Sequence, residues 1–547
     1  MKQINLLIFI LFTTIFTAQE NTYVSGSFES NSQILQDDSG LNFNAPNDNF
    51  RSNNYFQLDF QNGKILYGVQ FESYLPSALL GYSDVFSDNS EIAQYYLKYQ
   101  NEKNEITIGS FYEQFGNGLI FRAWEDRQLG INNSIMGVNY KYYPSDNLEF
   151  SIIHGKQRVG FDYSNSVISG LNSDYNLSKL LKSEELDISV GLGFVNRYQN
   201  LDAGFNEPKN VSVLGGRFNM FYEKFYLNIE VAKKNSDVLA NENIILSQRK
   251  YDGTALQLDV GYSRKGLGIN TSLRRLENYN FYSDKLAEGN IYNQQTISFT
   301  PALTKQQDYL LTNIYVYNAQ PRLVVNNLEK RAGEIGVQND IFYTFDKESL
   351  LGKFKTKLAL NFSYWGSLNT TFNEDQSYET SFGGSNERYY RDFNLEIKNR
   401  WNRKTSSTIT LLDLSIDKGV SQGGPVGVQG FINAKVGVVE INRIDQKNRN
   451  NRFVVQHLWT KEDRKDWLGF VYELGISNTI NLFISDIWNY GNDNDIHYYN
   501  LGGSFSKGAT RVGFNYGRQR GGLICVGGVC RFVPESNGFN LNLSHSF

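Results

Sequence analysis

Apolar and polar side chains alternate one for one along many stretches of this chain. The stretch FYLNIEVA (225–232) alternates Phe, Leu, Ile and Val with Tyr, Asn and Glu, and YFQLDFQ (55–61), LQLDVGYSR (256–264) and the closing NGFNLNLSHSF (537–547) follow the same rule. A repeat of two residues is the spacing of a β-strand with one apolar face. Beyond residue 18 no run of about 18 apolar residues occurs, so no transmembrane helix is predicted. The pattern therefore predicts an all-β protein.

The connections between these stretches alternate in length. Short ones lie at 61–64, 101–104, 144–147, 222–225, 264–268, 304–308, 402–406 and 506–509, and longer ones near 31–52, 75–91, 112–131, 199–211, 236–252, 277–292, 365–388 and 417–431. A sheet over a soluble core could show the same side-chain alternation, but turns on one side and loops on the other are typical of outer-membrane barrels. Closure is favoured because an open sheet would leave unpaired edges in hydrocarbon. We therefore predict a transmembrane antiparallel β-barrel of about 22–26 strands, about 26 by direct count, with short periplasmic turns and longer external loops.

Both ends of the chain fit an exported barrel. Residues 1–18 combine one lysine, an apolar run and a final small residue, which predicts a cleaved signal peptide, with a retained N-terminal helix as the alternative. Residues 19–547 are then expected to form a single β-barrel domain in the outer membrane of a Gram-negative bacterium. Phe547 ends an alternating strand on its apolar side, like the signal by which barrels are recognised for assembly. The barrel-assembly machinery is therefore an expected partner.

Aromatic residues are abundant although the chain is polar on average. They make up 14% of the residues, with 35 Tyr and 38 Phe, and the mean hydropathy is −0.44. Tyrosine and tryptophan near strand ends form girdles at membrane interfaces, and the candidates here are Tyr364, Trp365, Trp401, Trp459, Trp467 and Trp488. The net charge of −4 indicates no affinity for nucleic acid. Outer-membrane lipid is the expected surrounding.

The two cysteines stand close together in GGLICVGGVCRF. Gly527 and Gly528 suit a two-residue hairpin turn, which places Cys525 opposite Cys530 on paired strands. That spacing is compatible with a disulfide, and an exported chain meets oxidising conditions. A disulfide that stiffens the last external loop is therefore predicted. A metal site is not favoured, because two thiols without clustered histidines are an incomplete ligand set, and no cofactor is predicted.

The stretch GSFYEQFGNGLIFRAWEDRQLGINNS (109–134) concentrates charges among glycines and aromatic residues. It falls in the third external loop of the strand count, where porins fold a segment into the lumen. Opposed charges across such a constriction set pore size and ion preference. The hypothesis is that loop 112–130 narrows the lumen with Tyr112, Glu113, Gln114, Arg122, Glu125, Asp126 and Arg127. The alternative is a solvated outer loop with its own ion pairs.

Two motifs carry a resemblance to a known family. The stretches YEQFGNGL…R…EDR.LG.NN and CVGGVCR.VP…NG resemble those of an uncharacterised family of porin-like outer-membrane β-barrel proteins from Bacteroidota. The resemblance covers essentially the whole mature chain. It implies a barrel, residence in the outer membrane and no established activity, and it implies no catalytic residue.

The function predicted from these patterns is a porin-like channel for passive diffusion of small polar solutes, with a lumen lined by Asn, Gln, Ser and charged residues. The alternative is a non-conducting structural or interaction barrel that partners surface-export or adhesion machinery. An enzyme is not favoured, because of the 4 histidines only His497 lies near acidic residues, Asp493 and Asp495. A homo-oligomer or a lipoprotein partner is compatible with the sequence.

Overall fold

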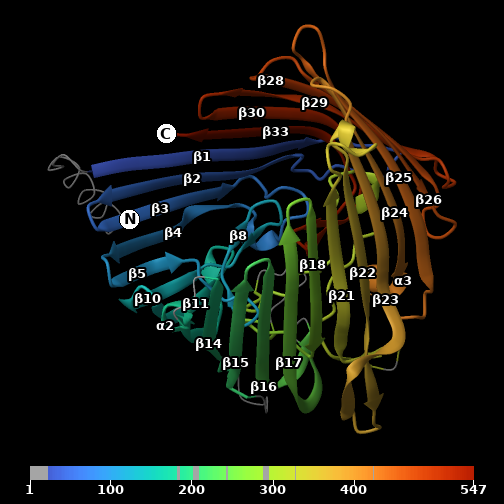
Figure 1. Cartoon of the computed structure of the whole chain (residues 1–547). Coiled ribbons are helices and arrows are strands. Elements are labelled where there is room, and N and C mark those ends of the chain that lie inside the picture. The colour runs from blue at the N-terminus through green and yellow to red at the C-terminus, as the bar shows by residue number, and fades with distance from the viewer. Residues whose placement is uncertain are drawn as a thin grey trace.

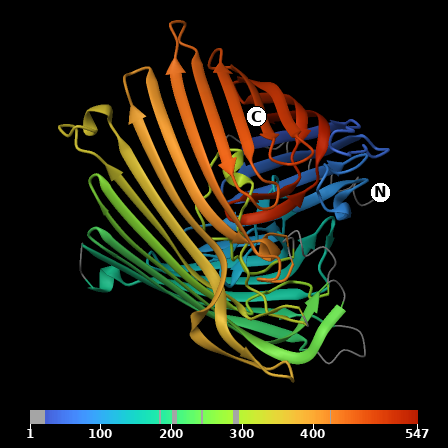
Figure 2. The ribbon, with the colours of Figure 1, turned by 90° about the vertical axis from the view of Figure 1, so that its right-hand side faces the viewer.

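The strands close into a single barrel. A computed structural model describes residues 22–181, 185–200, 208–241, 244–286, 295–326, 328–422 and 424–547; the signal peptide predicted over 1–18 lies outside the described residues. The main sheet contains 25 paired strands, of which the two-residue strand β12 pairs only with the end of β11. The remaining strands form an antiparallel ring of 24, within the predicted range. Figures 1 and 2 show the ring from two directions.

Most of the described chain belongs to this ring. Its strands are β1 (Thr22–Leu35), β2 (Phe50–Asn62), β3 (Ile65–Tyr74), β4 (Asn89–Gln100), β5 (Asn104–Phe111), β10 (Ile135–Ser145), β11 (Leu148–Val159), β13 (Val167–Asn176), β14 (Leu186–Tyr198), β15 (Asn210–Tyr222), β16 (Phe225–Asn241), β17 (Ile244–Arg264), β18 (Leu267–Glu277), β21 (Gly333–Thr344), β22 (Lys357–Phe372), β23 (Tyr378–Arg400), β24 (Thr405–Asp417), β25 (Phe431–Ile444), β26 (Asn450–Trp459), β27 (Trp467–Gly475), β28 (Ile480–Asn489), β29 (Ile496–Lys507), β30 (Thr510–Gln519) and β33 (Ser536–Ser546).

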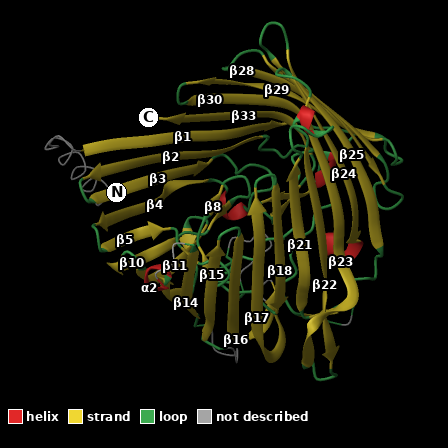
Figure 3. Cartoon of the chain, in the orientation of Figure 1, coloured by secondary structure: helices red, strands yellow, loops and turns green. Residues whose placement is uncertain are grey.

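The other elements are short. They are the strands β6 (Gln114–Phe115), β7 (Phe121–Arg122), β8 (Glu125–Asp126), β9 (Ile131–Asn132), β12 (Asp162–Tyr163), β19 (Val324–Val325), β20 (Lys330–Arg331), β31 (Gly522–Val526) and β32 (Val529–Val533), and the helical turns η1 (Asp84–Phe86), α2 (Ser178–Leu181), η3 (Leu311–Asn313), η4 (Gly352–Phe354) and α3 (Lys418–Gln422). Figure 3 shows how little helix there is. No helix among the described residues is long and apolar enough to span a membrane.

The first and last strands close the ring. β1 pairs with β33 antiparallel, with Phe28 opposite His545 and Ile34 opposite Phe539, and the two strands lie side by side in Figure 1. Beyond β33, the backbone N–H of Phe547 donates to the carbonyl of Gly26, and the N–H of Gly26 donates to the carbonyl of Phe547, both at 2.9 Å. Closure therefore leaves no open edge in the ring, as the energetic argument predicted.

The alternation read from the sequence separates an outer from an inner face. On β33 the exposed side chains Phe539 and Leu541 point outward. Asn540 and Asn542, which alternate with them along the strand, point into the barrel. The same holds on β14, where Leu192 is 65% exposed and Val195 is fully buried. Apolar residues thus face the membrane along the ring.

Three predicted connections are wrong. Residues 304–308 were predicted as a tight turn between strands. They belong to a long segment between β18 and β21 whose described residues add no strand to the ring, so the ring has 24 strands rather than about 26. Residues 236–241, 244–252 and most of 365–388, predicted as loops, are strand, because the hairpins β16–β17 and β22–β23 continue past their neighbours. The apolar residues of these extensions, such as Leu239 and Leu368, pack with Leu323 of the segment between β18 and β21, a partner that the local sequence does not indicate.

Candidate functional site: the occupied lumen

Three segments of the chain turn into the barrel. The inner loop (112–134) connects β5 to β10, the crossing segment (278–332, described over 278–286, 295–326 and 328–332) connects β18 to β21, and the disulfide hairpin (520–535) connects β30 to β33. In both Figure 1 and Figure 2 the chain between β18 and β21 runs within the ring of strands. All three segments start from the loop end of the barrel.

The inner loop is held against the wall by apolar side chains that fit over glycines. Ile120 is fully buried against the inward-facing glycines of β14 and β15. A methyl group on Gly215 would lie 2.7 Å from Cγ2 of Ile120, and one on Gly193 would lie closer still to its Cδ1. Phe115 occupies the same kind of position over Gly170 of β13, at 2.9 Å. Gly170, Gly193 and Gly215 have no side chains where the loop packs against the wall, so they leave a recess for it. We call these three residues the glycine seat.

The tip of the inner loop reaches the middle of the wall. The backbone N–H of Asn117 donates to Oε2 of Glu230 on β16 at 2.9 Å. Gly116 beside it has a φ of +57°, a left-handed conformation that glycine adopts at no steric cost. A side chain at Gly116 would also collide with Arg217 of β15. Glycine at position 116 therefore lets the tip of the loop turn where a side chain would not fit.

The residues predicted for a constriction lie together, but two of their five charges, Glu113 and Arg127, are paired with the wall. Glu113 accepts from Lys141 Nζ at 2.7 Å and from Asn139 Nδ2 at 2.8 Å, both on β10. Tyr112 donates to Asn132 Oδ1 at 3.2 Å, and the Gln114 side chain donates to the Gly116 carbonyl at 2.7 Å. Glu113 is thus neutralised by a wall lysine and does not face Arg122.

Arg127 joins the inner loop to the first strand. Its guanidinium pairs with Glu125 at 3.0 Å and with Glu29 of β1 at 2.6 Å, and it lies 4.2 Å from the ring centroid of Tyr55 on β2. Burial alone would lower the pKa of Arg127, but the two carboxylates raise it overall. Asp126 accepts from the backbone N–H of Leu129 at 2.8 Å, so it stabilises the turn that follows.

Arg122 has a different environment from Arg127. Its guanidinium stacks 4.6 Å from the ring centroid of Trp124 and 3.9 Å from that of Phe299 in the crossing segment. Burial lowers its pKa, although Asp126 is close enough to oppose this shift. Stacking between two aromatic rings is a favourable cation–π arrangement.

The crossing segment binds the inner loop through the backbone. The Arg122 N–H donates to the Ile297 carbonyl at 2.9 Å, the Phe299 N–H donates to the Gly118 carbonyl at 2.9 Å, and the Tyr279 hydroxyl donates to the Leu119 carbonyl at 3.1 Å. These hydrogen bonds come from two of the three described parts of the segment, 278–286 and 295–326. The two segments therefore form one body inside the barrel.

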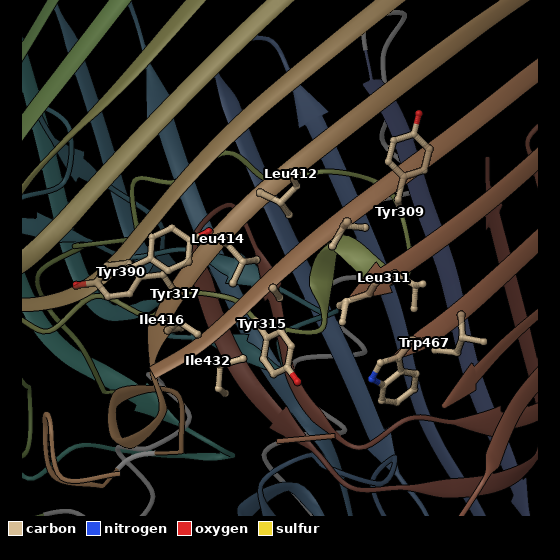
Figure 4. Packing of buried hydrophobic residues seen from close by; sticks show 14 of the residues in the cluster. Tyr309, Leu311, Tyr315, Tyr317, Tyr390, Leu412, Leu414, Ile416, Ile432 and Trp467 are labelled. Atoms are coloured by element: carbon tan, nitrogen blue, oxygen red, sulfur yellow. The ribbon is translucent and has the colours of Figure 1, made fainter. Parts of the chain in front are cut away.

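The crossing segment then reaches the opposite wall. Figure 4 shows Tyr309, Leu311, Tyr315 and Tyr317 facing apolar side chains of the strands. The wall side of this cluster comprises Trp365, Tyr389, Tyr390, Leu412, Leu414, Ile416, Ile432, Ala434, Val436, Val438, Val454, Leu458, Trp467, Ile487 and Tyr498. The Leu311 N–H donates to Gln456 Oε1 at 3.0 Å, and the Trp365 indole N–H donates to the Leu303 carbonyl at 3.0 Å.

A buried ion pair anchors the end of the crossing segment. Arg274 of β18 and Glu334 of β21 meet at 3.0 Å with both side chains fully buried. Glu334 also accepts from the Gln320 N–H at 2.7 Å and from the Tyr317 hydroxyl. Burial, with the Glu334 carboxylate next, raises the pKa of Tyr317. Two residues of the segment are thus held by one charged group on the wall.

The predicted disulfide is present, in a different place from the one expected. Cys525 and Cys530 are bonded across β31 and β32, which confirms the pairing. Cys530 is buried, and the hairpin contacts both other segments. The Ala302 N–H donates to the Gly528 carbonyl at 2.8 Å, and Val529 packs with Leu129 and Ile131 of the inner loop. The bond therefore stiffens a lumenal contact rather than a free external loop.

Comparison with known proteins gives the chain a family. A family model described as a family of unknown function (DUF6029) matches residues 1–547. The chain belongs to this family. Comparison with the curated proteins gave no match.

Among solved structures the DUF6029 chain is similar to other barrels. The translocation pore of the P pilus usher PapC matches with 8% identity and a TM-score of 0.42 over 96% of this chain and 99% of that one. An E. coli P pilus tip assembly intermediate, PapC-PapD-PapK-PapG, matches with 8% identity and a TM-score of 0.49 over 97% and 62%. Pseudomonas aeruginosa OccK11 (OpdR) matches with 9% identity and a TM-score of 0.35 over 96% of each chain.

Along single strands of this DUF6029 protein, the inner wall changes from polar near the turn end to apolar near the loop end. On β24 the inward positions are Ser406, Thr408 and Thr410 near the turn end, then Leu412, Leu414 and Ile416 near the loop end. On β25 they run from Asn442 and Glu440 to Val438, Val436, Ala434 and Ile432. The predicted polar lining thus holds for the turn half of these strands only. Two adjacent apolar residues, Leu411 and Leu412, point to opposite faces of β24. In the sequence, such a pair indicates a strand with apolar surroundings on both faces.

The arrangement offers recognition rather than bond chemistry. In the described part of the chain no three His, Cys, Asp or Glu side chains gather in a way that could hold a metal ion. His497 pairs with Asp486 at 2.6 Å and stacks on Trp488. Asp486 and Trp488 lie on the same face of β28 as the outward, exposed Ile484, so this pair faces away from the lumen.

Proposed function

We propose that the protein is an outer-membrane channel for the passive diffusion of small polar solutes, narrowed by its own inner loop. It resides in the outer membrane of a Gram-negative bacterium, after export with a cleaved signal peptide and assembly through the strand that ends at Phe547. The inner loop lines the narrow part of the path with Tyr112, Glu113, Gln114, Arg122, Glu125, Asp126 and Arg127.

The observation that carries the proposal is the polar half of the inner wall. Ser406, Glu440 and Asn442 face inward near the turn end and are partly exposed, whereas Thr408 and Thr410, closer to the cluster in which the crossing segment packs, are buried. Hydroxyl, amide and carboxylate groups are costly to bury without partners. An inner wall with this composition is suited to water, and a wet lumen is what porins have.

A second function has support from another observation. The body inside the barrel is fixed by fully buried side chains such as Ile120 and Trp467 and by the ion pair of Arg274 with Glu334. Such packing favours a non-conducting barrel that serves as a structural partner of surface-export or adhesion machinery. In that case a lipoprotein or a second copy would bind the exposed loops.

Conductance in planar lipid bilayers separates the two functions. The purified full-length protein is expected to give stable current steps, whereas silence would favour the structural barrel. Glu113→Ala leaves Lys141 with a weaker anionic neighbourhood and should shift the reversal potential toward anions. Arg122→Ala should shift it toward cations. Lys435→Ala is the matched control, because its side chain is 75% exposed on the outer face.

Opposite shifts in the two loop variants, with none in the control, would support the placement of these residues along the path. Identical reversal potentials in wild type and both loop variants would remove the inner loop from the path, even if the protein conducts.

A further inference from the structure

One sector of the inner wall gathers five amide side chains, of which three make no hydrogen bond to the described residues. It lies where β30, β33 and β1 meet, at the closure of the ring. Asn515 pairs with Asn540, and Asn540 pairs in turn with Gln33. One step toward the turn end, Asn542 pairs with Asn31. We call these five residues the amide rows.

The amide rows face the lumen at mid-height. They alternate with the exposed Phe514, Phe539 and Leu541, which point toward the membrane, so the amides point inward. Residues directly opposite on neighbouring strands have Cβ atoms about 5 Å apart. The rows are therefore a compact patch of side chains rather than scattered positions.

Among the described residues, no hydrogen bond engages the side chains of Asn515, Asn540 or Asn542, and the apolar clusters that hold the crossing segment include none of the five amides. Gln33 uses only its oxygen, which accepts from the Leu80 N–H at 2.9 Å. Asn31 donates to Glu29 Oε1 at 2.8 Å, so the open donors and acceptors of the rows are those of Asn515, Asn540 and Asn542. Asn219, a lumen-facing amide on β15, is by contrast engaged, because it donates to the Ser189 hydroxyl at 3.1 Å.

A second observation at the same place points to a ligand group. A hollow of about 40 Å³ lies between Gln33, Asn500, Asn515 and Asn540, together with Gly517 and Gly538, which have no side chains to fill it. The Asn500 Oδ1 atom is buried there and has no hydrogen-bond partner among the described residues. A buried acceptor without a donor is unfavourable. The hollow has room for a hydroxyl group or a water molecule, either of which would supply that donor.

Charge is absent from the rows themselves. The nearest carboxylate on the same face, Glu29, is already paired with Arg127 at 2.6 Å. Arg511 lies further along, opposite Ser506 at the turn end of β30. Arg51 on β2 lies directly opposite Gln33 and donates to the Ala78 carbonyl at 3.0 Å, so Gln33 separates this charge from the three free amides. The patch formed by the rows carries no charge of its own. Its amides match a ligand that both donates and accepts hydrogen bonds at closely spaced positions.

We infer that the amide rows are a binding site for neutral polyhydroxylated solutes, that is, for mono- or oligosaccharides passing through the lumen. The inference rests on the proposed channel function and specifies its solute class. The sugar hydroxyls exchange hydrogen bonds with Asn515, Asn540 and Asn542, and one of them enters the hollow and donates to Asn500.

The test uses the full-length protein in planar bilayers with maltotriose as the probe. Wild-type channels are expected to show current interruptions whose frequency rises with maltotriose concentration. The double variant Asn515→Leu/Asn540→Leu keeps side chains of similar size without amides, and should weaken maltotriose binding at least tenfold. Asn219→Leu makes the same change at a lumenal amide that is already engaged, and should leave the interruptions unaltered.

A polyethylene glycol of similar mass distinguishes recognition from simple obstruction. It has ether oxygens but almost no hydroxyl donors, and should lower the current equally in wild type and in the double variant. A second variant, Asn540→Asp, adds a charge with little change in shape, and should shift the reversal potential toward cations.

The outcomes separate this inference from the function on which it rests. Current that flows without maltotriose interruptions, or with equal interruptions in wild type and the double variant, would overturn the sugar site and leave the channel intact. An unchanged reversal potential in Asn540→Asp would also overturn it, because the amide rows would then lie off the path. A protein that never conducts would overturn the channel and the sugar site together.

Discussion

The contact of Ile120 with the glycine seat makes a quantitative prediction for Ile120→Ala. Ile120 is fully buried, and replacing such a side chain by Ala costs about 2–5 kcal/mol. The upper half of that range is expected, because Gly193 and Gly215 carry no side chains that could move into the space. Each 1.4 kcal/mol is about a factor of ten in an equilibrium. The undocked population of the inner loop should therefore rise roughly 300-fold to several thousand-fold.

Hydrogen exchange followed by mass spectrometry measures this population directly. Backbone amides of the inner loop that exchange through local opening do so at a rate proportional to the open fraction. The Arg122 and Phe299 amides, which hydrogen-bond between the two segments, should show the effect, whereas amides of β14 should not.

The control variant is Leu192→Ala, which removes an outward side chain adjacent to the seat, 65% exposed on the membrane face. It should leave exchange in the inner loop unchanged. If the loop amides of Ile120→Ala exchange at the wild-type rate, the seat does not hold the loop and the energetic argument is refuted.

Three further predictions concern other contacts. Deletion of Phe547, which removes both hydrogen bonds of the seam beyond β33, should lower the yield of folded, heat-modifiable protein in the outer membrane several-fold on unboiled gels. Arg274→Met leaves Glu334 buried without its cation and should destabilise the protein by about 3–5 kcal/mol, seen as a lower urea midpoint. Cys525→Ala/Cys530→Ala should fold, with a stability loss under about 2 kcal/mol because the closed loop is short, and with faster hydrogen exchange in the disulfide hairpin.

Each of these variants has a contrasting one. Ser546→Ala alters an inward residue next to the C-terminus and should assemble normally; equal loss in both would contradict a specific role for Phe547. The double variant Arg274→Met/Glu334→Gln removes the unpaired charge and should recover much of the lost stability. Unchanged exchange across 520–535 in the cysteine variant would show that β31 and β32 hold their place without the bond.

The ring could be predicted because each of its strands satisfies a local rule. Membrane on one side and water or polar contacts on the other impose a repeat of two residues, which is plain in β16 and β33. The disulfide followed from the turn at Gly527 and Gly528, which fixes the register of only the few residues around it. Fold class, closure and this pairing therefore needed no long-range information.

The contents of the barrel could not be predicted in the same way. The crossing segment is held by contacts with residues far away in the chain, such as Gln456 and Trp365, and these leave no periodic mark on its own sequence. The turn predicted at 304–308 is wrong because the polar residues there resemble a short connection between two strands. The charges of the inner loop were recognised as unusual, but their partners Lys141 and Glu29 come from strands whose polar positions resemble any others.

The seat beneath Ile120 has a consequence for how sequences of this family diverge. Gly193 and Gly215 are small only because the isoleucine occupies the volume in front of them. In relatives where either glycine has become alanine or valine, the residue aligned with Ile120 should have become smaller, so that the summed volume at the three positions stays nearly constant. These positions are expected to covary as a group, although Ile120 is distant from both glycines along the chain.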